Sequence, residues 1–283
     1  MLSKNYLAIY AKSFNWAGFF LPKKIYQSSS DLYDFCRTLD NIADQDLVLE
    51  IKKEIFKKYK SDFNNKNLEN PTIKKIYTLI DNFKILPSIV LDLFDGVESD
   101  LKEKIKFNSN KDLLIYSYRV AGTVGLMMAK ILNVKSHNAL KGAIDLGIAM
   151  QLTNITRDVI EDSKRNRNYI NPDFEKIKET LKLANKFYDS SFKSINEIPL
   201  SSRFAILVAR RIYREIGNRI LDKKNMENYK NSGKIYVSNF GKIYQTFLSI
   251  FDLIKLFFIK SEEHLRKDEH ATINEEINLN ERI

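Results

Sequence analysis

The stretch QLTNITRDVIEDSKRNRNYI, residues 151–170, places Asn154, Asp158 and Asp162 four residues apart. With about 100° between successive residues of an α-helix, these side chains lie within roughly 80° of one another. The apolar residues of the same stretch fall on the adjacent side, between roughly 100° and 160°: Leu152, Ile155 and Val159. The spacing predicts one helix that buries its apolar side and presents two carboxylates and an amide on a stripe.

A second acidic stripe lies earlier in the chain, in DLYDFCRTLDNIAD at residues 31–44. Asp40 and Asp44 are one helical turn apart, and Tyr33 and Arg37 lie within roughly 60° of Asp40. The apolar residues of this stretch share another side, between roughly 200° and 300°: Leu32, Phe35, Leu39, Ile42 and Ala43. This motif predicts a second helix with the same division between a buried side and a carboxylate stripe.

The two stripes indicate a site for divalent cations. Carboxylates one turn apart repel each other by a few tenths of a kcal/mol, so two such pairs beside apolar faces need either water or a bound cation. The alternative to a cation site is a solvent-facing stripe of ordinary surface acids. Mg²⁺ prefers oxygen ligands, keeps several waters and commonly bridges carboxylates to substrate phosphates. If the stripes face each other across a helical bundle, nearby basic side chains would neutralise a diphosphate leaving group. An apolar, aromatic pocket would then shield the resulting carbocation from water.

Helical periodicity extends from about residue 25 to residue 260, and no run shows the alternation of a β-strand. The prolines fall where helices are expected to start or stop: Pro22, Pro71, Pro87, Pro172 and Pro199. Two polar segments, residues 57–71 and 106–112, are predicted to be loops. We expect a single all-α domain over residues 1–260, because no linker separates the acidic motifs. Residues 261–283 lose the apolar stripe and are expected to form a polar tail that is frayed or disordered.

The chain resembles the squalene and phytoene synthases, the head-to-head isoprenyl diphosphate synthases, over nearly all of residues 5–260. Four stretches carry the resemblance: KSFNWAGFFLP (12–22), LYDFCRTLDNIAD (32–44), YSYRVAGTVGLMM (116–128) and QLTNITRDVIEDSKRNRNYI (151–170). It implies an isoprenoid-synthase helical bundle around a central cavity. The family often writes its first motif DDxxD, whereas this chain has Asn41 at the second position. On the helix Asn41 falls about 100° from Asp40, off the stripe, so the metal-binding pair is retained.

The resemblance also implies a Mg²⁺-dependent prenyltransferase, with Mn²⁺ as an alternative metal. In the family, two identical prenyl diphosphates condense through a cyclopropylcarbinyl diphosphate intermediate, and two diphosphates are released. Residues 120–134 and 145–159 are most similar to bacterial phytoene synthases, which implies geranylgeranyl diphosphate as substrate and carotenoid biosynthesis, with no NADPH. The alternatives use two farnesyl diphosphates, as in dehydrosqualene synthase or, with NADPH, squalene synthase. A non-catalytic assembly or scaffold member of the same fold is an alternative of another class.

Carried over position by position, the resemblance assigns metal binding to both stripes. The metal ligands it implies are Asp40, Asp44, Asn154, Asp158 and Asp162. The catalytic residues it implies are the four aspartates of that set together with two phenols placed near the departing diphosphate or the cation, Tyr33 and Tyr116.

The remaining assignments concern the substrate. Expected diphosphate contacts are Lys12, Arg37 and Arg157, and the residues matching the substrate entrance are Ser13 and Phe14. Gln151 matches a polar residue beside the cavity. A flap over the phosphates is expected to include Arg165, Arg167 and Tyr169, with Tyr229 and Lys234 as further phosphate-side groups.

Composition limits the partners. The formal net charge is +10, with lysine and arginine spread along the chain, which favours nucleic acid, an anionic membrane surface or a phosphorylated small molecule. We expect no nucleic-acid partner, because the sequence has no zinc-finger spacing, no basic region with heptads and no RNP-type aromatic strand. Prenyl diphosphates are the expected substrates, and transient association with a membrane surface is expected because substrates and product are apolar.

Localisation follows from the same sequence. The single cysteine, Cys36, excludes an intrachain disulfide and indicates a reducing compartment. The N-terminus has no continuous apolar core of a signal peptide. Residues 247–259 are apolar but contain Asp252 and Lys255, which is typical of a buried or interfacial helix. We therefore expect a cytoplasmic protein that associates peripherally with the inner face of the membrane.

Overall fold

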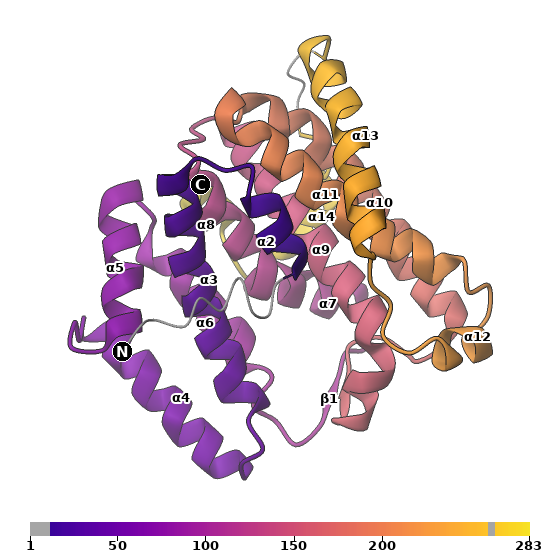
Figure 1. Cartoon of the computed structure of the whole chain (residues 1–283). Helices are drawn as coiled ribbons and strands as arrows, with labels where there is room; N and C mark the ends of the chain where they lie inside the picture. The colour runs from indigo at the N-terminus through magenta and orange to yellow at the C-terminus, as the bar shows by residue number, and fades with distance from the viewer. Residues whose placement is uncertain (1–11, 260–263) are drawn as a thin grey trace.

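The computed structural model describes residues 12–259 and 264–283, and it is an all-α bundle (Figure 1). The longer elements are α3 (Lys23–Asp44), α4 (Leu49–Asn64), α5 (Pro71–Phe83), α6 (Pro87–Glu98), α9 (His137–Lys164), α10 (Phe174–Ser194), α11 (Leu200–Leu221) and α13 (Asn239–Phe257). The shorter ones are α2 (Lys12–Gly18), α7 (Asn110–Ser117), the π-helix η1 (Tyr118–Gly122), α8 (Thr123–Ile131), the 3₁₀ turn η2 (Ile195–Glu197), α12 (Met226–Asn231), α14 (Lys267–Asn274) and the 3₁₀ turn η3 (Leu279–Glu281).

The helix ends are encoded locally, as the prolines predict. Pro71 and Pro87 occupy the first turns of α5 and α6, where the missing N–H of proline leaves no hydrogen bond unmade. Pro22 and Pro199 occupy the N-cap positions of α3 and α11. Ser109 caps α7 in a reciprocal capping box with Asp112, which satisfies two N–H groups at the helix start.

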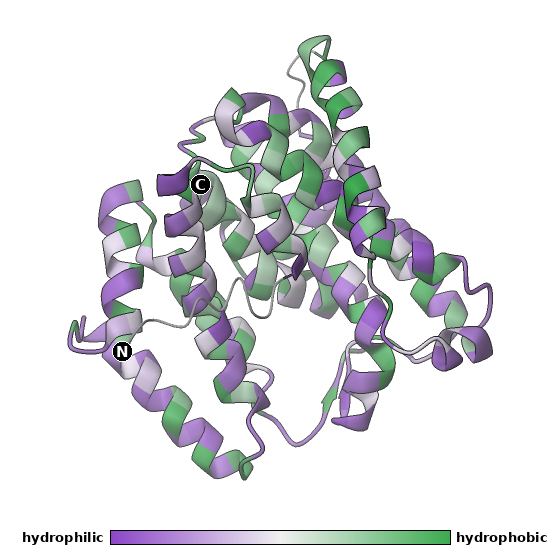
Figure 2. Cartoon of the chain, viewed as in Figure 1, coloured by the Kyte–Doolittle hydropathy of each residue, from purple (hydrophilic) through white to green (hydrophobic). Residues whose placement is uncertain are grey.

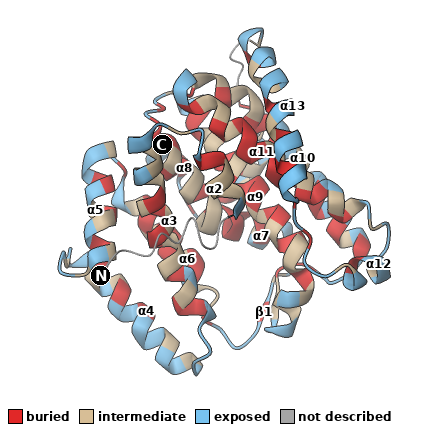
Figure 3. Ribbon diagram, in the orientation of Figure 1, coloured by how far each residue is buried: buried red, intermediate tan, exposed pale blue. Residues whose placement is uncertain are grey.

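Helix α9 lies in the middle of the bundle and packs against α8, α10 and α11 (Figure 1). The apolar sides predicted for α3 and α9 are confirmed, because every residue assigned to them is buried: Leu32, Phe35, Leu39, Ile42, Ala43, Leu152, Ile155 and Val159. Buried positions run along the inward sides of the helices, and exposed positions cover their outer sides (Figure 3). Burial of one side fixes how each helix is rotated, which determines where its polar stripe points.

Glycines set the separation of α9 from the helix preceding it. A Cβ at Gly125 in α8 would lie 2.2 Å from the carbonyl oxygen of Ala143. A Cβ at Gly147 in α9 would lie 2.2 Å from the carbonyl oxygen of Ala121. Both distances are shorter than van der Waals contact, so only glycine allows the two backbones to approach this closely.

Two local predictions need correction. Residues 57–64 belong to α4 and are not a loop, because Phe56, Tyr59 and Phe63 form a buried helical stripe between the lysines. The chain also contains a parallel pairing of two-residue strands, β1 (Ile105–Lys106) and β2 (Arg167–Asn168). These strands are too short to produce an alternating pattern in the sequence.

The expectation of a frayed C-terminal tail is wrong for residues 264–283, while residues 260–263 and the predicted boundary after 260 lie outside the described part. His264 Nε2 and His270 Nε2 lie 2.8 and 2.7 Å from the two carboxylate oxygens of Asp145 in α9. Arg282 donates to both carboxylate oxygens of Asp92 in α6. We call residues 264–283 the C-terminal clasp. Its buried apolar residues are irregularly spaced, so the sequence shows no apolar helical stripe in this segment: Ile273, Ile277 and Leu279.

No helix in the described part of the chain combines the length and the apolar character that crossing a membrane requires.

Candidate active site

The two predicted acidic stripes lie at the C-terminal ends of α3 and α9, and the segment after α9 joins them. Arg167 Nη1 donates to Asp44 Oδ1 at 2.8 Å, and its Nη2 donates to the Ala43 carbonyl at 3.3 Å. Arg165 Nη1 lies 3.6 Å from the same Asp44 oxygen. The pairing of β2 with β1 fixes the backbone at Arg167. The predicted flap residues therefore link the end of one stripe to the other.

Asp100 is a site residue that the sequence reasoning missed. It accepts hydrogen bonds from Tyr116 Oη at 2.7 Å and from Tyr169 Oη at 2.8 Å. The two phenol rings stack with centroids 4.7 Å apart, and Phe107 contacts both. Burial raises the pKa of Asp100, while the nearby Arg167 lowers it. Tyr116 and Tyr169, which come from the family resemblance, thus form one aromatic and acidic group beside Arg167.

The carboxylates of the site raise one another's pKa values. Surrounding protein atoms, and then the charge of Asp44, raise the pKa of Asp40 to about 7, although Asp40 retains access to solvent. Burial, and then the charge of Asp158, raises the pKa of Asp162 to about 7. Asp100 contributes to both increases. The two stripes therefore belong to one electrostatic site, in which acids are crowded beyond what the arginines neutralise.

Basic side chains line the α9 side of the site. Arg157 pairs with Asp158 through both Nε and Nη2. Lys234 Nζ lies 3.5 Å from Asp158 Oδ1 and 2.9 Å from Glu161 Oε2. Tyr229 Oη donates to the backbone carbonyls of residues 156 and 157 at 2.8 and 2.7 Å. Lys234 is thus positioned to bind an anion, whereas the hydrogen bonds of Tyr229 hold α12 against α9.

Aromatic residues lie on the buried side of the candidate site. Tyr33 lies close enough to Arg37 and Asp40 for their charges to affect its pKa, which burial raises. Tyr213 of α11 is a second missed residue, and its ring lies 4.8 Å from the ring of Phe14. Burial raises the pKa of Tyr213 to about 12, with smaller effects from Arg157 and Asp158. No spacing in the sequence connects α11 to either stripe, so only the packing reveals this residue.

The remaining predicted residues lie at the edges. Lys12 and Ser13 are the first two residues of α2. Lys12 lies near Lys242 of α13, and the pKa of Lys242 is lowered by burial and by the charge of Lys12. Among the described residues, no hydrogen bond or ion pair joins Lys12 to either acidic stripe. Gln151 Oε1 accepts from Asn154 Nδ2 at 3.4 Å, which places it one turn before Asn154 and about two turns before Asp158.

The donor set fits a hard cation. Asn154 Oδ1 is buried and has no hydrogen-bond partner in the structure, and an unsatisfied buried acceptor next to carboxylates is suited to a cation or its waters. In the described part of the chain, the stripe carboxylates do not gather three ligand atoms within 4.8 Å. Mg²⁺ retains several waters and uses one or two protein carboxylates with substrate phosphates, so such a cage is not required.

A different buried group has the composition of a metal site, namely Asp145 with His264 and His270, whose ligand atoms lie within 4.8 Å of one another. Both imidazole Nε2 atoms already contact the carboxylate. His270 Nδ1 is buried without a partner, whereas a metal-bound histidine usually donates its other N–H to an acceptor. We interpret this group as the hydrogen bonds that hold the C-terminal clasp.

Comparison with known proteins identifies the family of the chain. Residues 7–176 match the squalene/phytoene synthase family. The chain belongs to this family. The 15-cis-phytoene synthase of Enterobacter agglomerans is 30% identical over 244 residues, covering 75% of this chain and 82% of that protein. The 15-cis-phytoene synthase of Pantoea ananas is 28% identical over 247 residues, covering 76% and 80%.

Solved structures agree with the fold. A dehydrosqualene synthase in complex with a ligand superposes with a TM-score of 0.72 at 28% identity, covering 88% of this chain and 94% of that one. The squalene synthase HpnC from Alicyclobacillus acidocaldarius shares the fold, with a TM-score of 0.67 at 15% identity, covering 80% and 92%. The squalene/phytoene synthase resemblance and the all-α fold are confirmed. The chain is a prenyltransferase-type enzyme of head-to-head isoprenoid condensation.

The raised pKa of Asp162 predicts a pH-dependent effect of Asp162→Asn in this squalene/phytoene synthase. The folded-state value of about 7 exceeds the ordinary 3.8, so ionisation destabilises the metal-free fold increasingly between pH 4 and 7. With EDTA present, the variant should be more stable than wild type by about 1–2 kcal/mol at pH 8, after allowance for solvent screening, and by less than half as much at pH 5. Urea denaturation at both pH values measures this, and an equal difference at both would contradict the prediction.

Proposed function

We propose that the protein condenses two geranylgeranyl diphosphates to phytoene and is a phytoene synthase of carotenoid biosynthesis. The observation that supports this most is the joining of two carboxylate stripes by Arg167 and Asp100, directly beside an aromatic wall. The relatives that cover most of this chain with 28–30% identity include two named 15-cis-phytoene synthases. The geometry provides charge for a diphosphate and an apolar surface for its chain.

The proposed roles follow from placement. Asp40 and Asp44 of one stripe would hold Mg²⁺ together with the α9 stripe: Asn154, Asp158 and Asp162. When bound, Mg²⁺ would neutralise the diphosphate and make it a better leaving group. Mn²⁺ is a further candidate because it accepts the same oxygen ligands.

The chain's own cations complete the diphosphate site. Arg157, Arg167 and Lys234 already contact the stripe carboxylates and would exchange these contacts for phosphate oxygens. Arg37 and Arg165 lie beside Asp40 and Asp44, respectively, and we assign them the same role.

The apolar side would carry the prenyl chains. We assign this side to Tyr33, Phe14 and Tyr213, together with Tyr116, which stacks on Tyr169. Their ring faces would stabilise a carbocation and exclude water. The Tyr116 hydroxyl donates to Asp100 at 2.7 Å, which would hold it near the leaving group. We propose Ser13 at the substrate entrance, Lys12 as a further diphosphate contact, and Gln151 beside Asn154 at the cavity wall.

Product analysis tests the proposal and separates it from its alternatives. The purified protein with Mg²⁺ should convert geranylgeranyl diphosphate to phytoene without NADPH, and should convert farnesyl diphosphate much more slowly. Faster conversion of farnesyl diphosphate to dehydrosqualene, or to squalene with NADPH, would instead support the C15 alternatives. Absence of diphosphate release from either substrate would support a non-catalytic scaffold. We further propose that a cytoplasmic enzyme meets these apolar substrates at the membrane surface.

A further inference from the structure

Helix α13 carries a continuous apolar ridge on its outward side. Five of its residues and its C-cap residue recur every three or four positions and are each at least half exposed: Phe240, Tyr244, Phe247, Phe251, Ile254 and Phe258. We call them the α13 ridge. The hydropathy colouring shows this outer edge as largely apolar along the helix (Figure 2). The ridge spans roughly 28 Å at 1.5 Å per residue. Monomeric proteins rarely leave such a contiguous apolar surface in water without a partner.

A basic groove lies along one flank of the ridge. It has a volume of about 450 Å³ and lies between α10, α11 and α13. Four cationic side chains and three acidic ones line it, which leaves one net positive charge. Leu248 and Lys255 of its lining directly follow the ridge residues Phe247 and Ile254. The groove therefore opens beside the ridge.

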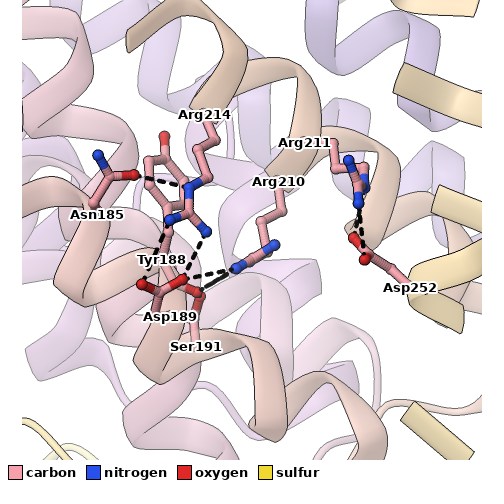
Figure 4. Close-up of polar contacts among 8 residues, drawn as sticks. All are labelled: Asn185, Tyr188, Asp189, Ser191, Arg210, Arg211, Arg214 and Asp252. Atoms are coloured by element: carbon pink, nitrogen blue, oxygen red, sulfur yellow. Dashed lines mark hydrogen bonds and ion pairs between the residues drawn. The ribbon is translucent and has the colours of Figure 1, made fainter. Parts of the chain in front are cut away.

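Two of the three carboxylates of the groove pair with its arginines (Figure 4), and Glu215 pairs with Arg219 outside the groove, so the remaining cations of the groove are Arg210 and Lys255. Arg211 donates to both oxygens of Asp252 at 2.6 and 2.9 Å. Arg214 donates to Asp189 at 2.6 and 3.4 Å.

Arg210 instead donates through Nε and Nη2 to the Tyr188 carbonyl at 3.0 and 2.8 Å, and lies 3.7 Å from Asp189. Arg210 and Lys255 both lie over the ring of Phe192, at 4.8 and 5.7 Å. Arg210 is 5% exposed. Lys255, which is exposed, is therefore the cation of the groove that an external anion can contact, and the nearby charge of Arg210 adds to the attraction.

We propose that the α13 ridge and the adjoining basic groove form the surface by which this protein docks on an anionic lipid bilayer, with a lipid phosphate at the groove. An interfacial helix buries its apolar face at the boundary between headgroups and acyl chains, and basic residues beside it contact anionic headgroups. The inference deepens the membrane association proposed above. It rests on surface residues that have no part in the catalytic assignments.

Charge favours a bilayer over a second copy of the chain. Two copies with a formal charge of +10 repel each other, and pairing ridge to ridge would bring two basic grooves together. An anionic bilayer offers an apolar interior for the ridge and negative phosphates for the groove. Both features of the surface are then used at once.

Sedimentation of the full chain with vesicles tests the proposal, in the absence of prenyl substrate. The wild type should bind phosphatidylcholine vesicles that contain phosphatidylglycerol, and should bind pure phosphatidylcholine vesicles much more weakly. Phe247→Ser combined with Phe251→Ser should weaken binding at least tenfold, on the order of 1.4 kcal/mol or more. Lys255→Gln should weaken binding only to the anionic vesicles, by about fivefold.

Matched controls separate the other occupants. Val48→Ser combined with Ile51→Ser changes two exposed apolar residues on and beside α4 and should leave vesicle binding unchanged. Circular-dichroism melting checks that every variant folds. The proposal is overturned if the ridge variant binds vesicles as tightly as wild type. It is also overturned if light scattering shows a dimer that the ridge variant dissociates. Because no step uses substrate, failure here leaves the catalytic proposal intact, and the reverse also holds.

Discussion

Asp158→Asn is expected to lower the rate of diphosphate release at least a thousandfold, while the variant remains folded. The substitution keeps the size of the side chain but removes the charge that would hold Mg²⁺ opposite Asp40. Metal stabilisation of a departing diphosphate contributes several kcal/mol, and each 1.36 kcal/mol corresponds to a factor of ten in rate. Asp40→Asn should have an effect of the same order. Steady-state release of diphosphate from geranylgeranyl diphosphate measures both.

The matched control is Asp189→Asn on α10. Asp189 also pairs with an arginine, Arg214, at 2.6 Å, but it lies in the basic groove and contacts neither stripe. Its variant should retain most of the activity. Near-normal turnover of both Asp40→Asn and Asp158→Asn, with unchanged circular dichroism, would contradict the metal assignment and return the stripes to the class of surface acids.

The second large effect is a fall in Mg²⁺ affinity as pH decreases. The pKa values of Asp40 and Asp162 are raised to about 7, so each of these side chains is protonated in most molecules at pH 6. A cation that binds them must displace these protons, which weakens binding by about tenfold per pH unit for each proton. From pH 8 to pH 6, the dissociation constant for Mg²⁺ should rise by about 10- to 100-fold.

Calorimetry on the protein without substrate measures this change, and it avoids the titration of the diphosphate itself. Treatment with EDTA should abolish turnover, and added Mg²⁺ should restore it. Equal Mg²⁺ affinity at pH 6 and pH 8 would mean that the metal is held elsewhere, or that the two aspartates are ionised throughout this range.

Periodicity predicted the parts of the fold that local packing controls. Leu152, Ile155 and Val159 are buried as expected, because a side chain's position around a helix follows from residue number alone. Residues 57–64, which were predicted to be a loop, contain the same helical periodicity of apolar residues. Phe56, Tyr59 and Phe63 are spaced by three and four residues, but the many lysines and asparagines around them concealed the stripe.

The candidate site was predictable only within single helices. Asp40 with Asp44, and Asp158 with Asp162, share stripes that spacing reveals. Asp100 follows α6 in a loop, and it joins the site only because the fold brings it to Tyr116 and Tyr169. A tertiary contact of this kind has no period in the sequence. The family resemblance supplied both tyrosines but not the carboxylate that orients them.

The C-terminal clasp constrains how the protein is made. Asp145 is completely buried, yet its imidazole partners come 119 and 125 residues later in the chain. During synthesis, α9 therefore emerges from the ribosome long before the groups that compensate its buried charge. The bundle should remain loosely closed around α9 until the clasp arrives, so a nascent chain stalled before His264 is a natural target for chaperones and proteases.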